Sequence, residues 1–479
     1  MLFTTGEYVL FLTAVVTLYW LTPYRRVRIW ILLVASFVFY ASWNRWLALL
    51  VAATSVADYF FGRAMDAADR PAIRKALLAA SLVMNLGLLC FFKYANFFLR
   101  SLEDGLRAAG ASASLPVLSV ILPVGISFYT FEAISYTVDV FRRRIPAERN
   151  LDHFLLFIVF FPHLVAGPIV RAADLLPQMA RPKRWSWPRV GLGLGLLAVG
   201  AFKKLAIADR MGLFVDPVFA SPASYSSAAV WTAAVGFAIQ VYCDFSGYSD
   251  MALGAAHLLG YKLVINFRMP FLAPNIAVFW RRWHISLSSW LRDYLFIPLG
   301  GSRHGTWKTN RNLLVTMTLA GLWHGASWPF VFWGFLQGAL LVVHRWWVRL
   351  LEPFPVVRAG LLSPPGTTLR VGFTFLLFVL TVVFFRAPTP STAWVVLDRL
   401  FVPAGGLPTP LLMRGFWVSV AFLVAGHAAG WYLTRSPFVW RRAWLRTPAP
   451  VLGAAGAGAI VFAVLLAPGA TRAFIYFQF

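Results

Sequence analysis

Apolar stretches long enough to cross a lipid bilayer recur along almost the whole chain, and they limit the possible folds more than any other feature. A membrane-spanning helix needs roughly 20 mainly apolar residues. Such stretches lie at about 5–22, 29–50, 75–99, 117–141, 151–170, 190–208, 228–243, 312–344, 371–386, 415–433 and 451–467. The sequence therefore predicts an all-α, polytopic integral membrane protein with about ten to thirteen membrane helices, embedded in a lipid bilayer.

The composition agrees with a membrane environment. Hydrophobic residues make up 59% of the 479 positions and charged residues only 13%, whereas a soluble domain carries about 25% charged residues. Proline and glycine interrupt the runs at 28–62, 117–141 and 312–344, so we expect some re-entrant or interfacial helices there. The simplest organisation is one integral domain over 1–479, with a motif-rich core at about 120–345.

The formal net charge of +25 does not indicate a nucleic-acid-binding protein. Lys and Arg lie mostly at the ends of apolar runs, and no single basic domain or stripe is present to follow phosphates. Arg25, Arg26 and Arg28 follow the first apolar run, so the positive-inside rule places the N-terminus outside. The alternation of basic loops breaks at 171–189, which indicates that the Pro- and Gly-containing segment 161–168 does not simply cross the membrane.

Cysteine and histidine spacing gives no support for a disulfide framework or a metal centre. Cys90 and Cys243 are far apart and lie in apolar context. No second histidine or cysteine stands at ligand spacing from the central histidines, so we expect no metal site and no tightly bound cofactor. His163, between Pro162 and Gly167, is a secondary candidate for function.

His324 is the leading candidate for a functional residue because it lies inside the apolar, Trp-rich stretch 319–334. A titratable group at membrane depth is expensive and therefore a candidate site by default. Gly321 and Gly325 flank His324 and would let a neighbouring helix or a thin substrate approach closely. A histidine that is simply hydrogen-bonded inside a helix bundle is the alternative interpretation.

Two carboxylates in segment 240–251 form a second polar group. Asp244 and Tyr248 would share one helical face, and Ser246 and Asp250 another. A carboxylate at the bilayer centre costs roughly 2.5 to 3.5 kcal/mol, so each aspartate needs a partner or water. Two interpretations are open: both aspartates pair with Arg or backbone donors and hold helices together, or they line a hydrated cavity that binds a polar group.

The segment 266–294 combines aromatic and cationic residues. Trp280, Arg281, His284 and Ser288 stand at i, i+3 and i+4 offsets, which predicts one amphipathic helix at the membrane interface. Arg281 and Arg282 have the chemistry to meet the phosphates of an anionic donor such as coenzyme A. A purely interfacial helix without chemistry would show the same pattern.

The motifs together resemble the membrane-bound O-acyltransferase (MBOAT) family, and within it the bacterial alginate O-acetyltransferase branch. They stand at 122–131, 161–168, 244–250, 266–267, 279–288, 322–326 and 474–479. His324 fits the family's catalytic histidine, and His284 fits its second characteristic histidine. The resemblance implies a funnel-shaped helical protein whose tunnel joins a cytoplasmic donor side to an extracytoplasmic acceptor side.

This resemblance implies an acetyl transfer reaction at the bacterial inner membrane. An apolar pocket favours the neutral imidazole, so His324 would act as general base on an acceptor hydroxyl that attacks a thioester, with acetyl-CoA as the expected donor. His284, Asn275 and Trp323 would orient the donor or stabilise the oxyanion. The expected partner is a periplasmic Ser-His-Asp (SGNH-type) acetyltransferase that modifies a polysaccharide such as alginate.

Several alternatives are open from the sequence. An acetyl-histidine intermediate competes with direct transfer. A D-alanyl transferase fed by an acyl carrier protein is the nearest alternative within the family. A transporter or flippase would use Asp244, Asp250 and His324 as a relay, and a non-catalytic scaffold would not need His324 at all.

Overall fold

The computed structural model describes residues 1–111, 114–409, 413–435, 447–448, 451, 453–458, 461 and 473–475. Helices account for most of these residues, which confirms the predicted all-α class. The chain divides into two compact units. The first unit comprises Met1–Leu194 and Ala252–Val264, and the second comprises Gly195–Met251 and Ile265–Phe479.

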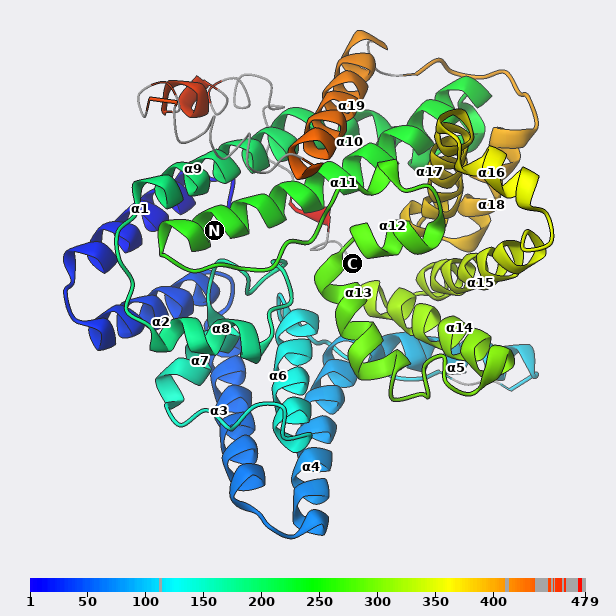
Figure 1. The fold of residues 1–479 in the computed structure, drawn as a ribbon. Helices are drawn as coiled ribbons and strands as arrows, with labels where there is room; N and C mark the ends of the chain where they lie inside the picture. The colour runs from blue at the N-terminus through cyan, green and yellow to red at the C-terminus, as the bar shows by residue number, and fades with distance from the viewer. Residues whose placement is uncertain are drawn as a thin grey trace. The chain divides into compact units, whose positions relative to one another are not determined.

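Helices of the first unit cover the predicted apolar runs at 5–22 and 75–99, whereas the run at 29–50 is broken between two helices and residues 117–125 are not helical. Asn44 caps the start of α3 (Arg45–Ala67) by accepting the backbone N–H groups of Trp46 and Leu47, and Pro71 begins α4 (Pro71–Leu89) at a position that needs no N–H donor. Helices α3, α4 and α6 pack side by side (Figure 1). The helices are α1 (Gly6–Leu21), α2 (Arg25–Ala41), α3 (Arg45–Ala67), α4 (Pro71–Leu89), a π-helical turn (Cys90–Tyr94), α5 (Ala95–Ala108), α6 (Ile126–Phe141), α7 (Leu151–Val159), α8 (Ala172–Ala180) and the start of α9 (Trp187–Ala201).

The apolar stretch 151–170 is not one straight helix, as the prolines and glycine predict. Helix α7 ends at Val159, and the chain then turns repeatedly through 161–167. The turn is tight, since a Cβ on Gly167 would lie 2.3 Å from the Cα of His163. His163 Nδ1 lies 3.1 Å from Oε1 of Glu132, which also accepts the N–H of Val170, so this buried loop is tied to α6.

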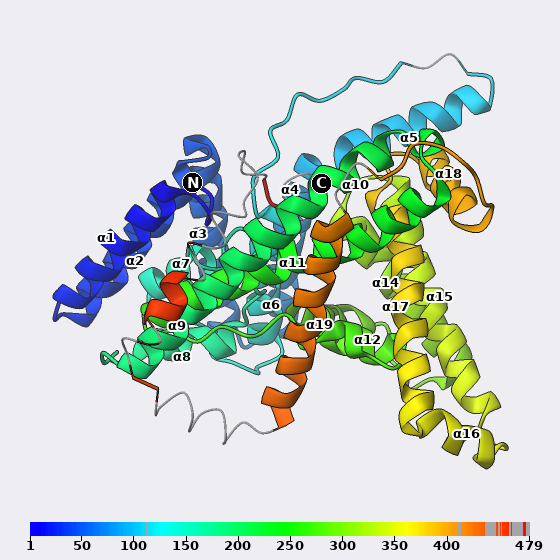
Figure 2. The same ribbon diagram turned by 90° about the horizontal axis from the view of Figure 1, so that it is seen from above.

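The second unit holds the remaining helices, except that residues 252–258 at the end of α11 (Ser227–Leu258) are assigned to the first unit. Helices α14, α15 and α17 lie beside one another (Figure 2). The helices of this unit are α10 (Asp209–Ala220), α11 (Ser227–Leu258), α12 (Ile276–Arg282), α13 (Ile285–Leu291), α14 (Gly305–His324), α15 (Trp328–Leu350), α16 (Pro355–Leu362), α17 (Pro364–Arg386), α18 (Pro390–Phe401) and α19 (Met413–Arg435). It also contains π-helical turns at Phe202–Ala208 and Arg292–Phe296 and 3₁₀ turns at Pro222–Ser224 and Pro270–Leu272.

Helices α14 and α15 form a hairpin with very close backbone contact. A Cβ on Gly321 would lie 2.2 Å from the carbonyl oxygen of Phe330 and 2.8 Å from the Cα of Gly334. Only glycine therefore fits at positions 321 and 334. The predicted close approach of a neighbouring helix at Gly321 is confirmed, while Gly325 packs against the ring of Phe330.

Six helical stretches in the described part are long and apolar enough to cross a membrane, which supports the predicted polytopic membrane class. This number is below the expected ten to thirteen, because the runs at 5–22, 117–141, 151–170 and 312–344 form helices that are shorter or more polar. The predicted stretch 451–467 lies mostly outside the described residues. The six stretches are Arg45–Ala67, Pro71–Ala108, Trp187–Ala220, Ser227–Leu258, Pro364–Arg386 and Gly415–Arg435.

Candidate active site

A break in the helix at His284 shapes the candidate site. The prediction of one amphipathic helix across this segment is wrong, because α12 ends at Arg282 and α13 begins at Ile285. Trp283 is extended, and His284 adopts a left-handed backbone with φ 43° and ψ 55°. A residue with a side chain adopts this conformation at a cost of about 1–3 kcal/mol, and only where its surroundings impose it.

Asn266 holds this break in place. Its side-chain oxygen accepts the hydroxyl of Ser286 at 2.6 Å and the N–H of the same residue at 3.3 Å. Its amide nitrogen donates to Ser249 Oγ at 3.2 Å, and its carbonyl oxygen accepts the N–H of Ile285. Asn266 is buried, so these contacts rigidly position the residue that follows His284. The sequence analysis did not assign Asn266 a role, although a polar residue in an apolar segment was a signal for one.

His324 ends α14 and lies among aromatic rings. The imidazole centroid is 5.0 Å from Trp323, 5.3 Å from Trp333 and 5.2 Å from Phe385, each in an edge-to-face arrangement. His324 is 5% exposed. This cage restricts the ring to a narrow range of orientations while leaving one side open to a cavity.

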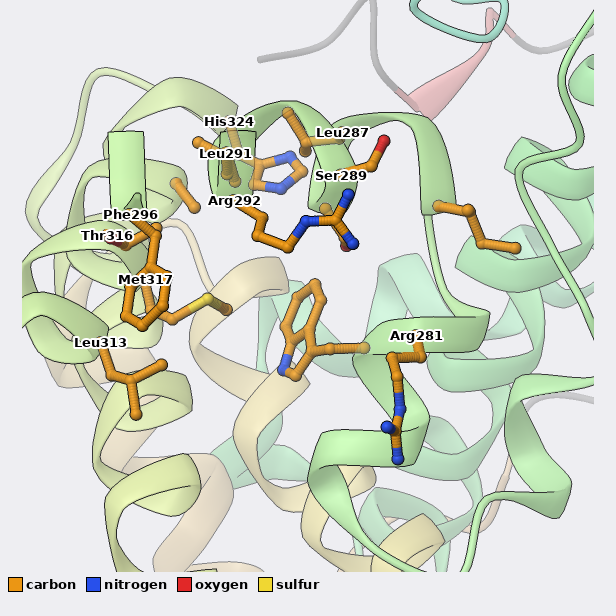
Figure 3. Close-up of a pocket in the computed structure, with 14 residues that line it drawn as sticks. Arg281, Leu287, Ser289, Leu291, Arg292, Phe296, Leu313, Thr316, Met317 and His324 are labelled. Carbon is orange, nitrogen blue, oxygen red and sulfur yellow. The ribbon is translucent and has the colours of Figure 1, made fainter. Parts of the chain in front are cut away.

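The cavity beside His324 has a volume of about 330 Å³, within the usual range for small-molecule sites. Figure 3 shows the imidazole in its wall, with Arg292 nearby and Arg281 farther along. Both arginines are exposed, so the cavity wall carries two cations at accessible positions. The rest of the wall is mainly apolar. The lining residues are Trp280, Arg281, Ile285, Leu287, Ser288, Ser289, Leu291, Arg292, Phe296, Leu313, Thr316, Met317, Ala320 and His324.

His284 lies in the same aromatic cluster but does not line the cavity. Its ring is 4.6 Å from Phe245 and 6.0 Å from Trp323, which also contacts His324. Complete burial, followed by the neighbouring His324, lowers the pKa of His284 well below its usual value. The His284 imidazole is therefore neutral at physiological pH.

Asp244 and Asp250 form ion pairs with adjacent lysines of the π-helical turn. Asp244 lies 2.5 Å from Lys204, and Asp250 lies 2.6 Å from Lys203. Neither aspartate lines the His324 cavity. This geometry matches the interpretation in which the carboxylates are paired inside the protein, with lysine in place of the expected arginine. The sequence analysis missed both lysines.

The other predicted site residues separate into two groups. Arg281 lines the cavity, and Trp323 stands between the two histidines. Asn275 instead caps α12 by accepting the N–H of Val278 at 2.8 Å, and Arg282 donates to the carbonyl oxygen of Leu272 at 3.1 Å. Asn275 and Arg282 therefore do not line the cavity. Arg292 lines it, although the sequence analysis did not single out this residue.

Comparison with known proteins places this arrangement in one family. The profile described as MBOAT, membrane-bound O-acyltransferase family, matches residues 140–385. The chain is 40% identical over 403 residues to the probable alginate O-acetylase AlgI of Azotobacter vinelandii, covering 84% of this chain and 78% of the relative. It is 36% identical over 404 residues to the peptidoglycan O-acetyltransferase of Helicobacter pylori, covering 78% and 73%.

A weaker match covers a smaller part of the chain. The teichoic acid D-alanyltransferase of Streptococcus thermophilus is 30% identical over 240 residues, which is 47% of this chain and 57% of the relative. The family match, together with the six helical stretches of the described part that are long and apolar enough to cross a membrane, defines a multi-pass membrane acyltransferase. The chain belongs to the membrane-bound O-acyltransferase family, and it is an enzyme of the O-acetyltransferase type.

Proposed function

We propose that this enzyme transfers acetyl groups from a cytoplasmic thioester, acetyl-CoA, across the bacterial inner membrane for O-acetylation of an extracytoplasmic polysaccharide such as alginate. The relatives that match most of the chain support this substrate class, because their names specify O-acetylation of alginate or peptidoglycan. The observation that carries the proposal is the His324 imidazole in the wall of a mainly apolar cavity.

His324 acts as the general base in the proposed reaction. Its imidazole nitrogen takes the proton from the acceptor hydroxyl while the hydroxyl oxygen attacks the thioester carbonyl. The C–S bond then breaks, and the leaving thiolate takes the proton back. His324 stands in the last turn of α14, where the partial negative charge of the helix end stabilises the transient imidazolium by about 0.3–1 kcal/mol.

The neighbouring residues take positioning roles. His284 is neutral and lies in the aromatic cluster that contacts His324, so it helps to set the imidazole orientation through Trp323. Arg281 and Arg292 are the cations of the cavity wall, and guanidinium groups bind phosphate oxygens through paired hydrogen bonds. They are therefore suited to the phosphates of the acyl donor.

The route of the acetyl group after the first step has two forms. In direct transfer, the acceptor hydroxyl attacks the donor thioester in the His324 cavity. In a relay, the imidazole itself is acetylated and then passes the group on. In either form, a periplasmic acetyltransferase with a Ser-His-Asp site is the expected partner that delivers the acetyl group to the glycan.

The test is transfer of radiolabelled acetyl from acetyl-CoA by the purified protein in liposomes, with the candidate partner present. His324→Ala should abolish transfer and remain folded. His304→Ala, which changes an exposed histidine outside the cavity lining, should retain it. Equal activity of wild type and His324→Ala would remove the general-base role. Transfer of D-alanine from a loaded carrier protein, without use of acetyl-CoA, would favour the D-alanyl alternative.

A further inference from the structure

A second cavity lies in the first unit, between the start of α2 and the segment that follows α8. Its volume is about 150 Å³, and a water molecule occupies roughly 30 Å³ of liquid, so a group of several heavy atoms fits. Four cations line it, and its lining contains no Asp or Glu. The polar lining residues are Tyr19, Arg25, Arg28, Arg181, Lys183 and Tyr261.

Backbone carbonyl groups, rather than carboxylates, hold the arginines of α2. Arg25 Nη1 donates to the carbonyl oxygen of Ala180 at 2.5 Å, and Arg28 Nη1 donates to that of Lys183 at 3.1 Å. The Arg28 guanidinium also lies 5.2 Å from the centroid of the Tyr19 ring. These contacts fix the side chains, but a neutral backbone carbonyl group does not cancel the positive charge of a guanidinium group.

Arg181 and Lys183, in the segment that follows α8, add two more positive charges to the cavity lining. Lys183 Nζ lies 4.4 Å from the centroid of the Tyr261 ring. Burial, with Arg189 and Arg181 adding to it, lowers the pKa of Lys183 to about 8. Within the described ranges, no salt bridge involves any of the four lining cations. The cavity therefore carries concentrated positive charge that an anion would neutralise.

The N-terminus of α2 borders the same cavity. Arg25 and Arg28 lie in the first turn of this 17-residue helix, and no side chain caps its start. The unpaired N–H groups and the positive end of the helix dipole favour an anion at such a position. This is a second source of positive potential, independent of the side chains.

We propose that this cavity binds a phosphate group, either of an anionic phospholipid headgroup or of a soluble phosphate ester. Arginine forks match the geometry of phosphate oxygens, and the buried tyrosines Tyr19 and Tyr261 add hydroxyl groups. The contacts of Arg25 and Arg28 with 180–183 place both basic segments together, and the positive-inside rule assigns them to the cytoplasmic face. Anionic headgroups are present at that face. The site would bind phosphate whether or not His324 takes part in catalysis.

The test compares two double variants of the full-length protein that remove the same charge. Arg25→Gln/Lys183→Gln removes two lining cations, whereas Arg26→Gln/Arg184→Gln removes the adjacent exposed cations outside the lining. Retention of phosphatidylglycerol is measured by native mass spectrometry in nanodiscs of mixed phosphatidylglycerol and phosphatidylcholine. Binding of inorganic pyrophosphate to the detergent-solubilised protein is measured by calorimetry.

We expect the cavity variant to lose about tenfold in affinity for at least one probe, while the control changes less than about twofold. Loss of lipid retention alone identifies a headgroup site, and loss of pyrophosphate binding alone identifies a soluble phosphate ligand. Equal losses in the two double variants would overturn the proposal in favour of diffuse surface charge, and so would failure of the wild type to bind either probe. If the cavity variant does not fold, Arg181→Gln serves instead, since Arg181 lines the cavity and its side chain forms no hydrogen bond or ion pair with another described residue.

Discussion

Lys204 Nζ lies 2.5 Å from Asp244 Oδ1 in the interior of the second unit, where both side chains are almost completely buried. Asp244 Oδ2 accepts the N–H of Ile475 at 2.9 Å, and the Lys204 ammonium lies 4.6 Å from the centroid of the Phe474 ring. Asp209 lies 2.8 Å from the same ammonium. This ion pair therefore connects the π-helical turn, α11 and the segment 473–475.

Replacing Lys204 with Met should strongly destabilise the protein, because buried Asp244 would lose the ammonium group that pairs with it. Breaking a buried pair in this way costs about 3–5 kcal/mol in the free energy of unfolding. Thermal unfolding in detergent measures the loss. Lys203→Met is the control, since the Lys203–Asp250 pair is 24% and 23% exposed and should contribute less. Similar losses for the two variants would contradict this account.

Removing the Asn266 amide should disturb the backbone break at His284. Asn266→Ala removes the two hydrogen bonds from the Ser286 hydroxyl and N–H to the Asn266 side chain, each worth about 0.5–1.5 kcal/mol. We expect lower thermal stability together with weaker acetyl transfer. Ser249→Ala, which removes only one hydrogen bond to the same amide, should cost about 1 kcal/mol. Wild-type activity in a folded Asn266→Ala enzyme would show that the break does not need this support.

A methyl group at Gly321 should force α14 and α15 apart. Its Cβ would lie 2.2 Å from the carbonyl oxygen of Phe330, which is backbone and cannot rotate away. Overpacking typically costs about 1–3 kcal/mol, and His324 would move with the end of α14. Gly372→Ala in α17 is the matched control, because a Cβ there meets nothing within 4 Å. Stability and acetyl transfer should fall for Gly321→Ala only.

The neutral state of buried His284 gives the stability of the folded protein a specific pH dependence. Its folded pKa lies well below the unfolded value of about 6.5, so between the two values the unfolded state binds more protons. Stability therefore rises with pH in this window and falls as the pH drops below about 6.5, by at most about 1.4 kcal/mol for each pH unit. Thermal unfolding at pH 7.5 and pH 5.5 measures this difference.

His284→Asn isolates this contribution, since Asn tolerates the left-handed backbone and does not titrate. The variant should lose less stability than the wild type between the two pH values. His304→Asn, at an exposed position, should keep the wild-type pH dependence. If both variants show the wild-type difference, His284 is not the responsible group.

Much of the candidate site was predictable because its residues are unusual for their local context. His324 is a titratable group in an apolar stretch, Trp323 precedes it directly, and Arg281 stands in a separate segment rich in aromatic and cationic residues. The structure places Arg281 in the cavity wall and Trp323 against both histidines. Asn275, by contrast, is a helix cap, which the sequence does not distinguish from a donor-orienting amide because both roles use the same side-chain oxygen.

The sequence by itself determined the all-α membrane class, because a long apolar run that crosses a bilayer has to satisfy its backbone N–H and C=O groups within its own helix. Only the tertiary structure decided the partners of the polar groups. Lys204 and Asp244 are 40 residues apart, and their pairing depends on how two helices pack. The left-handed backbone of His284 likewise follows from distant contacts of Asn266, since local helical propensity alone would have continued the helix through it.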